Sequence, residues 1–533
     1  MKILIRNASI VDGTANTPFE GDILINSDII EKVAAHIDEK IDISSGDIII
    51  DAKGLYVAPG FIDMHTHTDW ANFIPNGLKP KIMQGITTEV VGQCGFSLAP
   101  MPTAKQKKWR AGLVIGDSPT PEWRWQGMDE YLSELTKNGL ESNLVPFVGH
   151  NALRFAIAED AARPLTRDEI VLLEKLLEAS FDSGVFGASF GLIYIPAIFA
   201  TPEELSVIAK VVAKRNGMVA VHMRSESDEL IEALQEMVEL TSKVRCKLHI
   251  SHLKAIGSRN WHKISDVLRI IESKGLTFDH YPYTAGSTSL LSIFPPFMLG
   301  GYSTTEQAIQ SFSKPANRLR LKNIFLGTEP LPKGAPWDNL PNLLGWENII
   351  IVSTEKPENQ KYIGKNILEI AREESKDPTD VAIDLIVAEH GKVRMIDYHS
   401  SEESIIEKLR HKSGMIGTDT LYGGKPHPRV SGTYPRLFKQ YVFDKQVISI
   451  EELVEQMTAR PAKTLGLPNR GLILPGYKAD LVFFDRTFAD CSTYQNPIAD
   501  PIGLRNVMIN GKFKVKDGEY MSEIRSGEVI RKQ

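Results

Sequence analysis

The sequence predicts an α/β protein: a (β/α)8 TIM-like barrel with a small β-sandwich domain formed by both ends of the chain. Two observations predict this fold. Between about residues 58 and 420, apolar strand-like runs alternate with helical patterns, and eight such runs can be counted. The two ends of the chain instead contain short strand patterns separated by turn residues. Eight strands alternating with helices are typical of a (β/α)8 barrel, and β-rich ends on both sides suggest one additional β-domain.

Length and composition narrow the class of protein. The chain has 533 residues, of which 42% are hydrophobic and 24% charged, as in ordinary soluble globular proteins. A formal net charge of −6 indicates no basic surface for nucleic acid or an anionic membrane, so neither partner is expected. The three cysteines, Cys94, Cys246 and Cys491, are too few and too scattered for a disulfide framework. They indicate a reducing compartment, and we expect a cytoplasmic location.

The two ends of the chain are predicted to form the β-sandwich domain. Residues 1–57 contain the strand patterns KILIRNASIV, GDILINSDII and DIIIDAKGLYVA, with turn signals between them. Residues 466–533 contain similar patterns in LVFFD and VMINGKFKVKDGEY. The opening MKILIRNASIVDG fits a strand and a turn rather than a signal peptide. No run approaches the roughly 18 apolar residues of a membrane span.

The barrel is predicted to cover residues 58–465. One of its helical segments begins at Thr166, has Glu169 three residues later as in a capping box, and stops at Gly184. Roughly 130 residues separate the seventh and eighth strand-like runs, and the Pro- and Gly-rich part, about 285–345, is predicted to be an insertion. It is either a lid over the barrel mouth or a surface insertion. The eight runs are APGFIDMHTH (58–67), TTEVVGQCG (87–95), NLVPFVGH (143–150), VFGASFG (185–191), MVAVHMRSE (218–226), CKLHISHLK (246–254), LTFDHYPY (276–283) and GMIGTDT (414–420).

Residues that could bind a metal recur where the predicted strands end, which is where barrels carry their function. Each of them alone has an ordinary explanation, such as a buried thiol or a carboxylate that caps the next helix. Because ligand types recur at equivalent positions of five predicted strands, together they indicate a metal or catalytic site. The strand ends carry His65, His67, Cys94, His150, His222, His252, Tyr283 and Asp419.

The residue types at these positions favour zinc chemistry. His65 and His67 are two residues apart on a strand, so both can face the barrel axis. Neutral imidazole and thiolate suit zinc, and a carboxylate completes such a site. Asp419, at the end of the eighth run, is placed to take a proton from a metal-bound water.

Several segments carry recognisable motifs: APGFIDMHTHTD, GITTEVVGQCGFSLAP, VGHNALR, HMRSES, HISHLK, DHYPYTAGS, IGTDT, HPRVSGTYPRLF and MTARPAKTLGLPNRGLILPGYKADLVFFD. In these segments the chain resembles the amidohydrolase superfamily and, within it, the N-acyl-D-amino-acid deacylases (D-aminoacylases). The similarity covers essentially the whole chain. The GQCG turn, the SHLK strand and the HPR segment are the more specific to the deacylase branch. In one departure, the chain has Thr418-Asp419-Thr420 where that branch commonly has Ser-Asp-Gly.

The resemblance implies one tightly held zinc ion and a neighbouring metal position that is weakly occupied or empty in this branch. The tight site matches Cys94, His222 and His252. The neighbouring position matches His65, His67 and Asp419. Cys94 takes the place of the carboxylated lysine that bridges two metals in many superfamily members, and Asp419 matches the catalytic acid and base.

The amino-acid half of such a substrate carries a carboxylate, which needs cationic or hydroxyl partners. A guanidinium suits a carboxylate because it offers a bidentate fork. Each candidate also has a structural explanation, a surface ion pair or a capping hydroxyl. The candidate substrate-binding residues are Lys254, Tyr283, Ser287, Ser289 and Arg429.

The sequence therefore predicts zinc-dependent hydrolysis of N-acyl-D-amino acids, with metal-bound hydroxide as the nucleophile and Asp419 as general base and acid. The preference for D over L rests on the resemblance alone. One alternative is hydrolysis of a cyclic amide, as in dihydropyrimidinases and dihydroorotases, against which stand Cys94 and the HPR segment. Another is a non-catalytic scaffold, although the chain retains every metal-ligand residue. The expected partner is a small-molecule substrate, and the number of metal ions and a homo-oligomeric state are left open.

Overall fold

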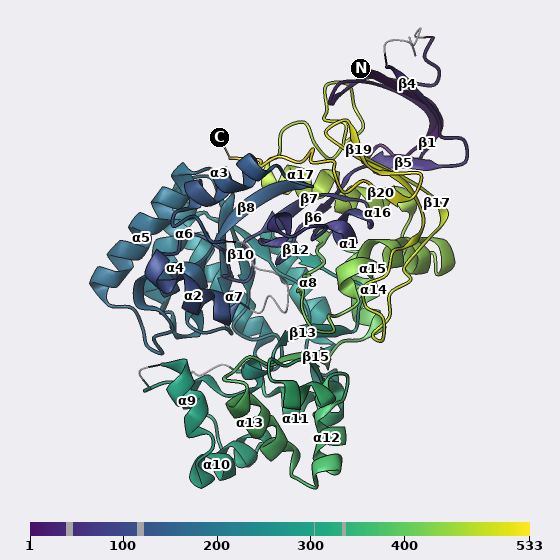
Figure 1. The fold of residues 1–533 in the computed structure, drawn as a ribbon. Coiled ribbons are helices and arrows are strands. Elements are labelled where there is room, and N and C mark those ends of the chain that lie inside the picture. The colour runs from purple at the N-terminus through teal and green to yellow at the C-terminus, as the bar shows by residue number, and fades with distance from the viewer. Residues whose placement is uncertain (39–45, 114–121, 303, 333–336, 533) are drawn as a thin grey trace.

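The fold is described from a computed structural model that defines residues 1–38, 46–113, 122–302, 304–332 and 337–532. Its central body is a parallel barrel surrounded by helices (Figure 1). A β-rich domain lies on one side of the barrel and a mostly helical layer on another. Within the defined ranges, none of the helices has the length and apolar character that a membrane crossing requires.

Eight parallel strands form the barrel, which confirms the predicted fold class. Neighbouring strands follow one another in the chain, and β16 pairs with β12 at the end of the series. The barrel is completed by backbone hydrogen bonds from Met64 N to Ile416 O, 3.1 Å, and from Asp419 N to His65 O, 2.7 Å. The strands are β6 (Phe61–Asp63), β7 (Ile86–Val91), β8 (Asn143–Gly149), β9 (Gly187–Gly191), β10 (Met218–His222), β11 (Lys247–Ile250), β12 (Thr277–His280) and β16 (Gly414–Ile416).

Helices cover the outside of the barrel (Figure 1). The predicted capping box is present: the Thr166 side chain accepts from Glu169 N, and the Glu169 carboxylate accepts from Thr166 N. The helix that follows ends at Asp182, just before Gly184, whose φ of 92° suits glycine. The helices are α1 (Lys79–Ile82), α2 (Thr103–Gly112), α3 (Met128–Asn138), α4 (His150–Ala158), α5 (Arg167–Asp182), α6 (Pro202–Lys214), α7 (Leu230–Val244), α8 (Lys263–Lys274), α14 (Glu402–Leu409), α15 (Arg429–Arg436), α16 (Ile450–Met457) and α17 (Ala459–Leu465).

Both ends of the chain contribute strands to one nine-stranded sheet, as the sequence predicted. The sheet curves so that Ile3 and Ile5 of its first strand share an apolar core with Leu481 and Phe483. Alternate residues of the same C-terminal strand face the other way, into the core shared with the barrel helices. The strands are β1 (Lys2–Ile10), β2 (Phe19–Asn26), β3 (Ile29–Ala34), β4 (Ile48–Asp51), β5 (Tyr56–Pro59), β17 (Leu481–Ala489), β18 (Ile502–Ile509), β19 (Lys512–Lys516) and β20 (Glu519–Tyr520).

The insertion between β12 and β16 extends past residue 345, where the sequence analysis placed its end. Its first strand pairs antiparallel with its last, so the chain leaves and rejoins the barrel at one place. The Pro- and Gly-rich composition ends near residue 345, but this closing strand comes about 50 residues later. The elements are β13 (Ala285–Ser289), α9 (Thr305–Ser311), α10 (Pro315–Phe325), α11 (Leu340–Leu344), β14 (Ile349–Ser353), α12 (Ile367–Glu374), α13 (Pro378–Ala388) and β15 (Arg394–Tyr398).

Candidate metal centre and active site

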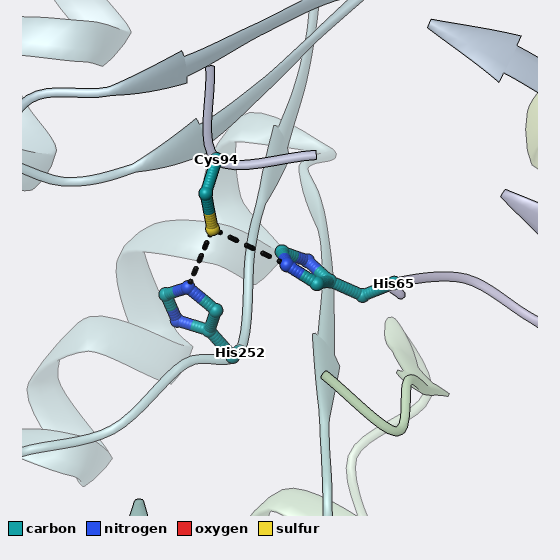
Figure 2. Close-up of side chains that lie close together, drawn as sticks. All are labelled: His65, Cys94 and His252. Carbon is teal, nitrogen blue, oxygen red and sulfur yellow. Dashed lines mark hydrogen bonds between the residues drawn. The ribbon is translucent and has the colours of Figure 1, made fainter. Parts of the chain in front are cut away.

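Donor side chains from five strand ends meet at the carboxyl end of the barrel. Cys94 follows β7, and its Sγ lies 3.3 Å from His65 Nε2 and 3.2 Å from His252 Nε2 (Figure 2). His222 is the last residue of β10, and its Nδ1 lies 3.7 Å from the same sulfur. All four residues are buried. The thiol is therefore surrounded by three imidazoles.

Asp419 and His67 adjoin this group. His67 Nε2 lies 3.3 Å from Asp419 Oδ1, and His65 Nε2 lies 3.7 Å from the same oxygen. Arg429 places its Nη2 3.0 Å from the other carboxylate oxygen, Oδ2. The six residues that the sequence analysis singled out as metal ligands thus lie in one cluster.

The donor set fits a zinc ion. A tetrahedral zinc ion places a sulfur and a nitrogen ligand roughly 3.5 Å apart. The Sγ–N distances of 3.2, 3.3 and 3.7 Å lie on both sides of that value. His65 is as close to Cys94 as His252 is, so the cluster around the thiol is larger than the set implied by the resemblance. Three compact donor groups occur among the defined residues: His65–Cys94–His252, His65–His67–Asp419 and His222–Glu226–His252.

One carboxylate orients the two histidines of β10 and β11. Glu226 Oε2 lies 3.3 Å from His222 Nε2, and Oε1 lies 3.2 Å from His252 Nδ1. Lys254 donates to both Glu226 oxygens over 2.8 and 2.9 Å. Burial opposes the charge on Glu226, but Lys254 and the imidazoles outweigh it and lower the pKa of this carboxyl. Glu226 thus faces the second nitrogen of each imidazole, and the first nitrogen of each faces Cys94.

Asp279 has the same role for His65, and the sequence analysis did not single it out. Its Oδ2 lies 3.4 Å from His65 Nδ1 and 2.9 Å from His249 Nε2. Its Oδ1 accepts from the backbone N of His252 over 2.9 Å. A signal was available, because Asp279 is an acidic residue within the buried strand β12, where an unpaired carboxylate would be costly.

The charges of the cluster favour a thiolate and an ionised carboxylate. Burial alone would raise the pKa of Cys94, but the charges of His65 and His252 outweigh it and hold that pKa well below its ordinary range. Burial would also raise the pKa of Asp419, whereas the Arg429 guanidinium and the nearby imidazoles lower it well below the usual value. At neutral pH the cluster therefore presents two anionic donors.

Three of the site residues have left-handed backbones. The φ values are 50° for Cys94, 35° for His252 and 49° for Asp419. Residues with a Cβ rarely adopt this conformation, which costs on the order of 1 kcal/mol and persists where surrounding contacts fix it. All three lie where the chain turns at the end of a strand, so the turn itself aims the side chain at the cluster.

The cluster opens into a cleft with two lobes, a larger one of about 350 Å³ and a smaller one of about 140 Å³. Both lobes reach Asp419, and both are lined by Tyr194 and by residues 287–289 of β13. The insertion thus forms part of the cleft wall. The larger lobe is also lined by His222, Lys254, Tyr281, Asp397 and His399. The smaller lobe is also lined by His67, Trp70, Cys94, Leu98, Arg394, Leu421 and Tyr422.

The candidate substrate-binding residues occupy different places. Ser287 and Ser289 line both lobes. Lys254 lines the larger lobe, but its ammonium is engaged by Glu226 and lies 2.7 Å from His252 Nδ1.

Arg429 and Tyr283 lie deeper. Arg429 is fully buried behind Asp419 and stacks over Tyr281, 4.8 Å from the ring centre. Tyr283 lines neither lobe of the cleft, and its hydroxyl donates to Asp490 over 3.4 Å. Tyr281, two residues earlier, lines the larger lobe instead. His150 lies outside the cluster, 2.6 Å from Glu204.

The two threonines beside Asp419 hold a buried lysine. Thr418 donates from its backbone N to Asp63 Oδ1 over 2.8 Å and from its hydroxyl to Oδ2 over 2.7 Å. The Lys81 ammonium donates to Asp63, to Thr418 and, over 3.3 Å, to Thr420. The departure from Ser-Asp-Gly therefore adds a hydroxyl at Thr420 that contacts the ammonium at the β6–β16 junction.

The fold and this cluster define a class of protein, the (β/α)8 barrels with histidine, cysteine and carboxylate side chains gathered at the strand ends. The chain belongs to the amidohydrolase family, whose model matches residues 49–281 and 385–514. The gap in the match covers most of the insertion.

Within this family, the chain is similar in sequence and structure to deacylases of N-acyl-D-amino acids. The chain is 30% identical to a D-aminoacylase of Alcaligenes xylosoxydans xylosoxydans over 515 residues, 96% of this chain and 93% of that protein. It is similar to the structure of an N-acyl-D-glutamate deacylase from Bordetella bronchiseptica complexed with zinc and a phosphonate inhibitor, with a TM-score of 0.79, 26% identity and 99% of each chain covered. A structure of D-aminoacylase described by its binuclear metal centre has a TM-score of 0.80 and 29% identity, with 99% of each chain covered.

Proposed function

We propose that the protein is a zinc-dependent hydrolase that cleaves the amide bond of N-acyl-D-amino acids, releasing a carboxylic acid and a free D-amino acid. The observation that carries the proposal is the cluster of Cys94, His222 and His252 beside an ionised Asp419 at the mouth of the barrel. The D-aminoacylase and the N-acyl-D-glutamate deacylase that the chain resembles over nearly its whole length support the linear amide substrate and its D configuration.

The ligands of the tight zinc site are proposed to be Cys94, His222 and His252. His65, His67 and Asp419 form a neighbouring position, and the binuclear centre named for a similar D-aminoacylase supports a second ion there. A bound zinc ion supplies Lewis acidity and lowers the pKa of a bound water toward about 7.

Asp419 is proposed to be the group that moves the proton. Its low pKa keeps it ionised before the reaction, so Oδ1, which faces the imidazoles, can accept a proton from the attacking water. Arg429 holds Oδ2 and keeps the carboxylate turned toward the cluster. Because a carboxyl with a low pKa gives up its proton readily, Asp419 then protonates the departing nitrogen.

The substrate is proposed to contact β13. Ser287 and Ser289 line the cleft beside Asp419, and the Ser287 hydroxyl has no hydrogen-bond partner among the defined residues. Arg429 also has two unpaired donors in that part of the structure, Nε and Nη1, which suit a carboxylate. Lys254 is engaged by Glu226, so we assign it to orienting the site, and we assign Tyr283, whose hydroxyl donates to Asp490, no contact with the substrate.

A cytoplasmic location is part of the proposal. It is supported by the three cysteines, none of which forms a disulfide. The partner is a small-molecule substrate.

The proposal is tested by removing metal with a chelator, restoring zinc, and measuring amine release from paired N-acetyl-D- and N-acetyl-L-amino acids. Zinc-dependent release from the D series alone is the expected result. Absence of release from both series, with zinc bound, would contradict the proposed substrate. Release that does not depend on zinc would contradict the assigned metal centre.

A further inference from the structure

We propose that Arg394 binds a carboxylate of the substrate in the smaller lobe of the cleft. The inference rests on the proposed function, because it concerns the substrate of that reaction. Arg394 belongs to β15, the strand that closes the insertion, and carried no role in the sequence analysis.

Arg394 is a buried guanidinium that has no carboxylate within 4.0 Å among the defined residues. Its side chain is almost fully buried, with 1% of the residue exposed, and it lines the smaller lobe. Nη1 donates to the backbone oxygen of Tyr422, whereas Nη2 has no partner within the defined part of the chain. Burial lowers the pKa of Arg394 to about 10, so the group remains charged at neutral pH. The charge of Arg429 acts against this guanidinium and that of Asp419 acts in its favour without a contact. A buried guanidinium with no carboxylate in contact is costly, which indicates that an anion completes this site.

The other cations of the cleft differ from Arg394 in this respect. In the part of the chain that the structure defines, each lysine or arginine that lines the larger lobe has a carboxylate within 4.0 Å. The pairs are Lys108 with Glu159 at 2.7 Å, Arg224 with Glu236 at 3.1 Å, Lys254 with Glu226 at 2.8 Å and Lys392 with Glu355 at 2.9 Å. Arg429, behind the cleft, is paired with Asp419. Among the defined residues that line the cleft, Arg394 is therefore the cation with no carboxylate within 4.0 Å, and its Nη2 has no hydrogen-bond partner there.

The surroundings of Arg394 suit a carboxylate that belongs to the substrate. Ser287 and Ser289 line the same lobe, and the unpaired Ser287 hydroxyl offers a second donor. Asp419 borders the lobe as well, so an anion held by Arg394 lies in the cavity where the proton is transferred. This carboxylate is either the α-carboxylate of the amino acid or a second one on its side chain or acyl group, and the chemistry of recognition is the same.

The test compares substrates that differ only in a carboxylate. One pair is N-acetyl-D-methionine and its carboxamide, which reports the α-carboxylate. The others are N-acetyl-D-glutamate with N-acetyl-D-glutamine and N-succinyl-D-methionine with N-succinamoyl-D-methionine, which report a second carboxylate. Each is measured with the wild-type zinc enzyme, Arg394→Gln and Arg394→Lys. Lys392→Gln, two residues earlier, is the matched control, because it removes a cation that already has a partner.

We expect Arg394→Gln to lower kcat/KM by about 10- to 100-fold for the carboxylate member of one pair and by less than about 3-fold for its amide, mainly through KM. The substrate pair that shows this selective loss identifies which carboxylate Arg394 binds. Arg394→Lys should recover part of the loss, and Lys392→Gln should show no such selectivity. Equal effects on both members of every pair, or no effect, would overturn the inference.

Binding is measured alongside turnover, so that the two proposals can fail separately. Calorimetric titration measures binding without hydrolysis. The ligand pairs are D-methionine with D-methioninamide, D-glutamate with D-glutamine, and succinate with succinamate. Titration of the wild-type protein remains informative even where a variant does not fold. Carboxylate-selective binding that Arg394→Gln removes, without turnover of any substrate, would contradict the proposed function and support this inference. Turnover of N-acyl-D-amino acids with no carboxylate selectivity in wild-type binding would support the proposed function and contradict this inference.

Discussion

The two halves of the donor cluster are supported in different ways. On one side, the second nitrogens of His222 and His252 face a single carboxylate, Glu226, which Lys254 neutralises. On the other side, a single carboxylate, Asp419, is itself shared: imidazoles face one of its oxygens and a guanidinium faces the other. We call these the Cys94 half, formed by Cys94, His222 and His252, and the Asp419 half, formed by His67 and Asp419.

The difference indicates a division of work. The side chain of His252 is 2% exposed, whereas those of His67 and Asp419 are 12% and 10% exposed. In the Cys94 half a carboxylate faces the second nitrogen of both histidines, an arrangement that suits the binding of a metal ion. The Asp419 half keeps an ionised carboxylate at the edge of the cleft, where it can exchange a proton.

The largest effect should come from the Cys94 half. Cys94→Ala removes the thiolate, and we expect loss of stoichiometric zinc and a fall in kcat/KM of at least about 1,000-fold, because the metal supplies the electrophile and the acidified water. Metal analysis of the dialysed protein and an amine-release assay measure both. Cys246→Ala, at a cysteine outside the cluster, is the control. Full zinc content in Cys94→Ala would remove the distinction between the halves.

The Asp419 half should separate chemistry from metal binding. Asp419→Asn keeps the shape but cannot accept a proton, so we expect kcat to fall about 100- to 10,000-fold while the tightly bound zinc is retained. Zinc content and kcat are measured on the same preparation. Near-normal turnover would assign the proton transfer to another group, and loss of all zinc would show that the carboxylate is needed to hold the ion.

A smaller effect on zinc affinity is expected at Glu226, which contacts the two histidines of the Cys94 half. Glu226→Gln leaves the ligands in place but weakens the orientation of His222 and His252, so zinc affinity should fall about 10- to 100-fold. Competition with a chelator of known affinity measures this change. Glu236→Gln, which loses a partner of Arg224 outside the cluster, is the control and should leave zinc affinity unchanged.

The smallest effect concerns the free energy of unfolding and depends on His280, a buried histidine near the Asp419 half. His280 ends β12, its carbonyl accepts from Gly417 N over 3.1 Å, and neither of its ring nitrogens has a partner among the defined residues. Burial, assisted by Lys408, lowers the pKa of His280 to about 3. Between pH 6.5 and 3 the unfolded chain therefore binds a proton that the folded chain does not, and the free energy of unfolding falls as the pH falls.

From pH 7 to pH 5 this loss should be about 2 kcal/mol. Urea unfolding of the wild type and of His280→Leu at both pH values measures it, and the variant should lose about 2 kcal/mol less. An apolar replacement is suitable because neither ring nitrogen of His280 has a hydrogen-bond partner among the defined residues. His36→Leu, at an exposed histidine, is the control. Equal losses in the wild type and His280→Leu would show that the imidazole is protonated in the folded protein.

Sequence patterns predicted the barrel, the terminal β-domain and the six clustered donors, because strand ends and ligand types can be read residue by residue. They did not predict Asp279, whose role follows from which side chains meet across β6, β11 and β12. Nor did they distinguish Tyr281 from Tyr283, because the chain turns after β12 and alternation along a strand no longer applies. The sequence also did not predict the role of Arg394. Its neighbours come from the insertion and from the segment after β16, and only the packing of the folded chain brings them together.

The terminal sheet has a consequence for the order of events during synthesis. β5 pairs with β17, and more than 400 residues lie between them in the chain. At about 5 to 20 residues per second, the ribosome makes that stretch in roughly 20 to 90 seconds. Throughout this time one edge of β5 has no partner of its own, and such an edge can pair with a neighbouring nascent chain. A barrel that folds before β17 is made therefore does so beside an unfinished sheet, which becomes complete only when the C-terminal strands emerge.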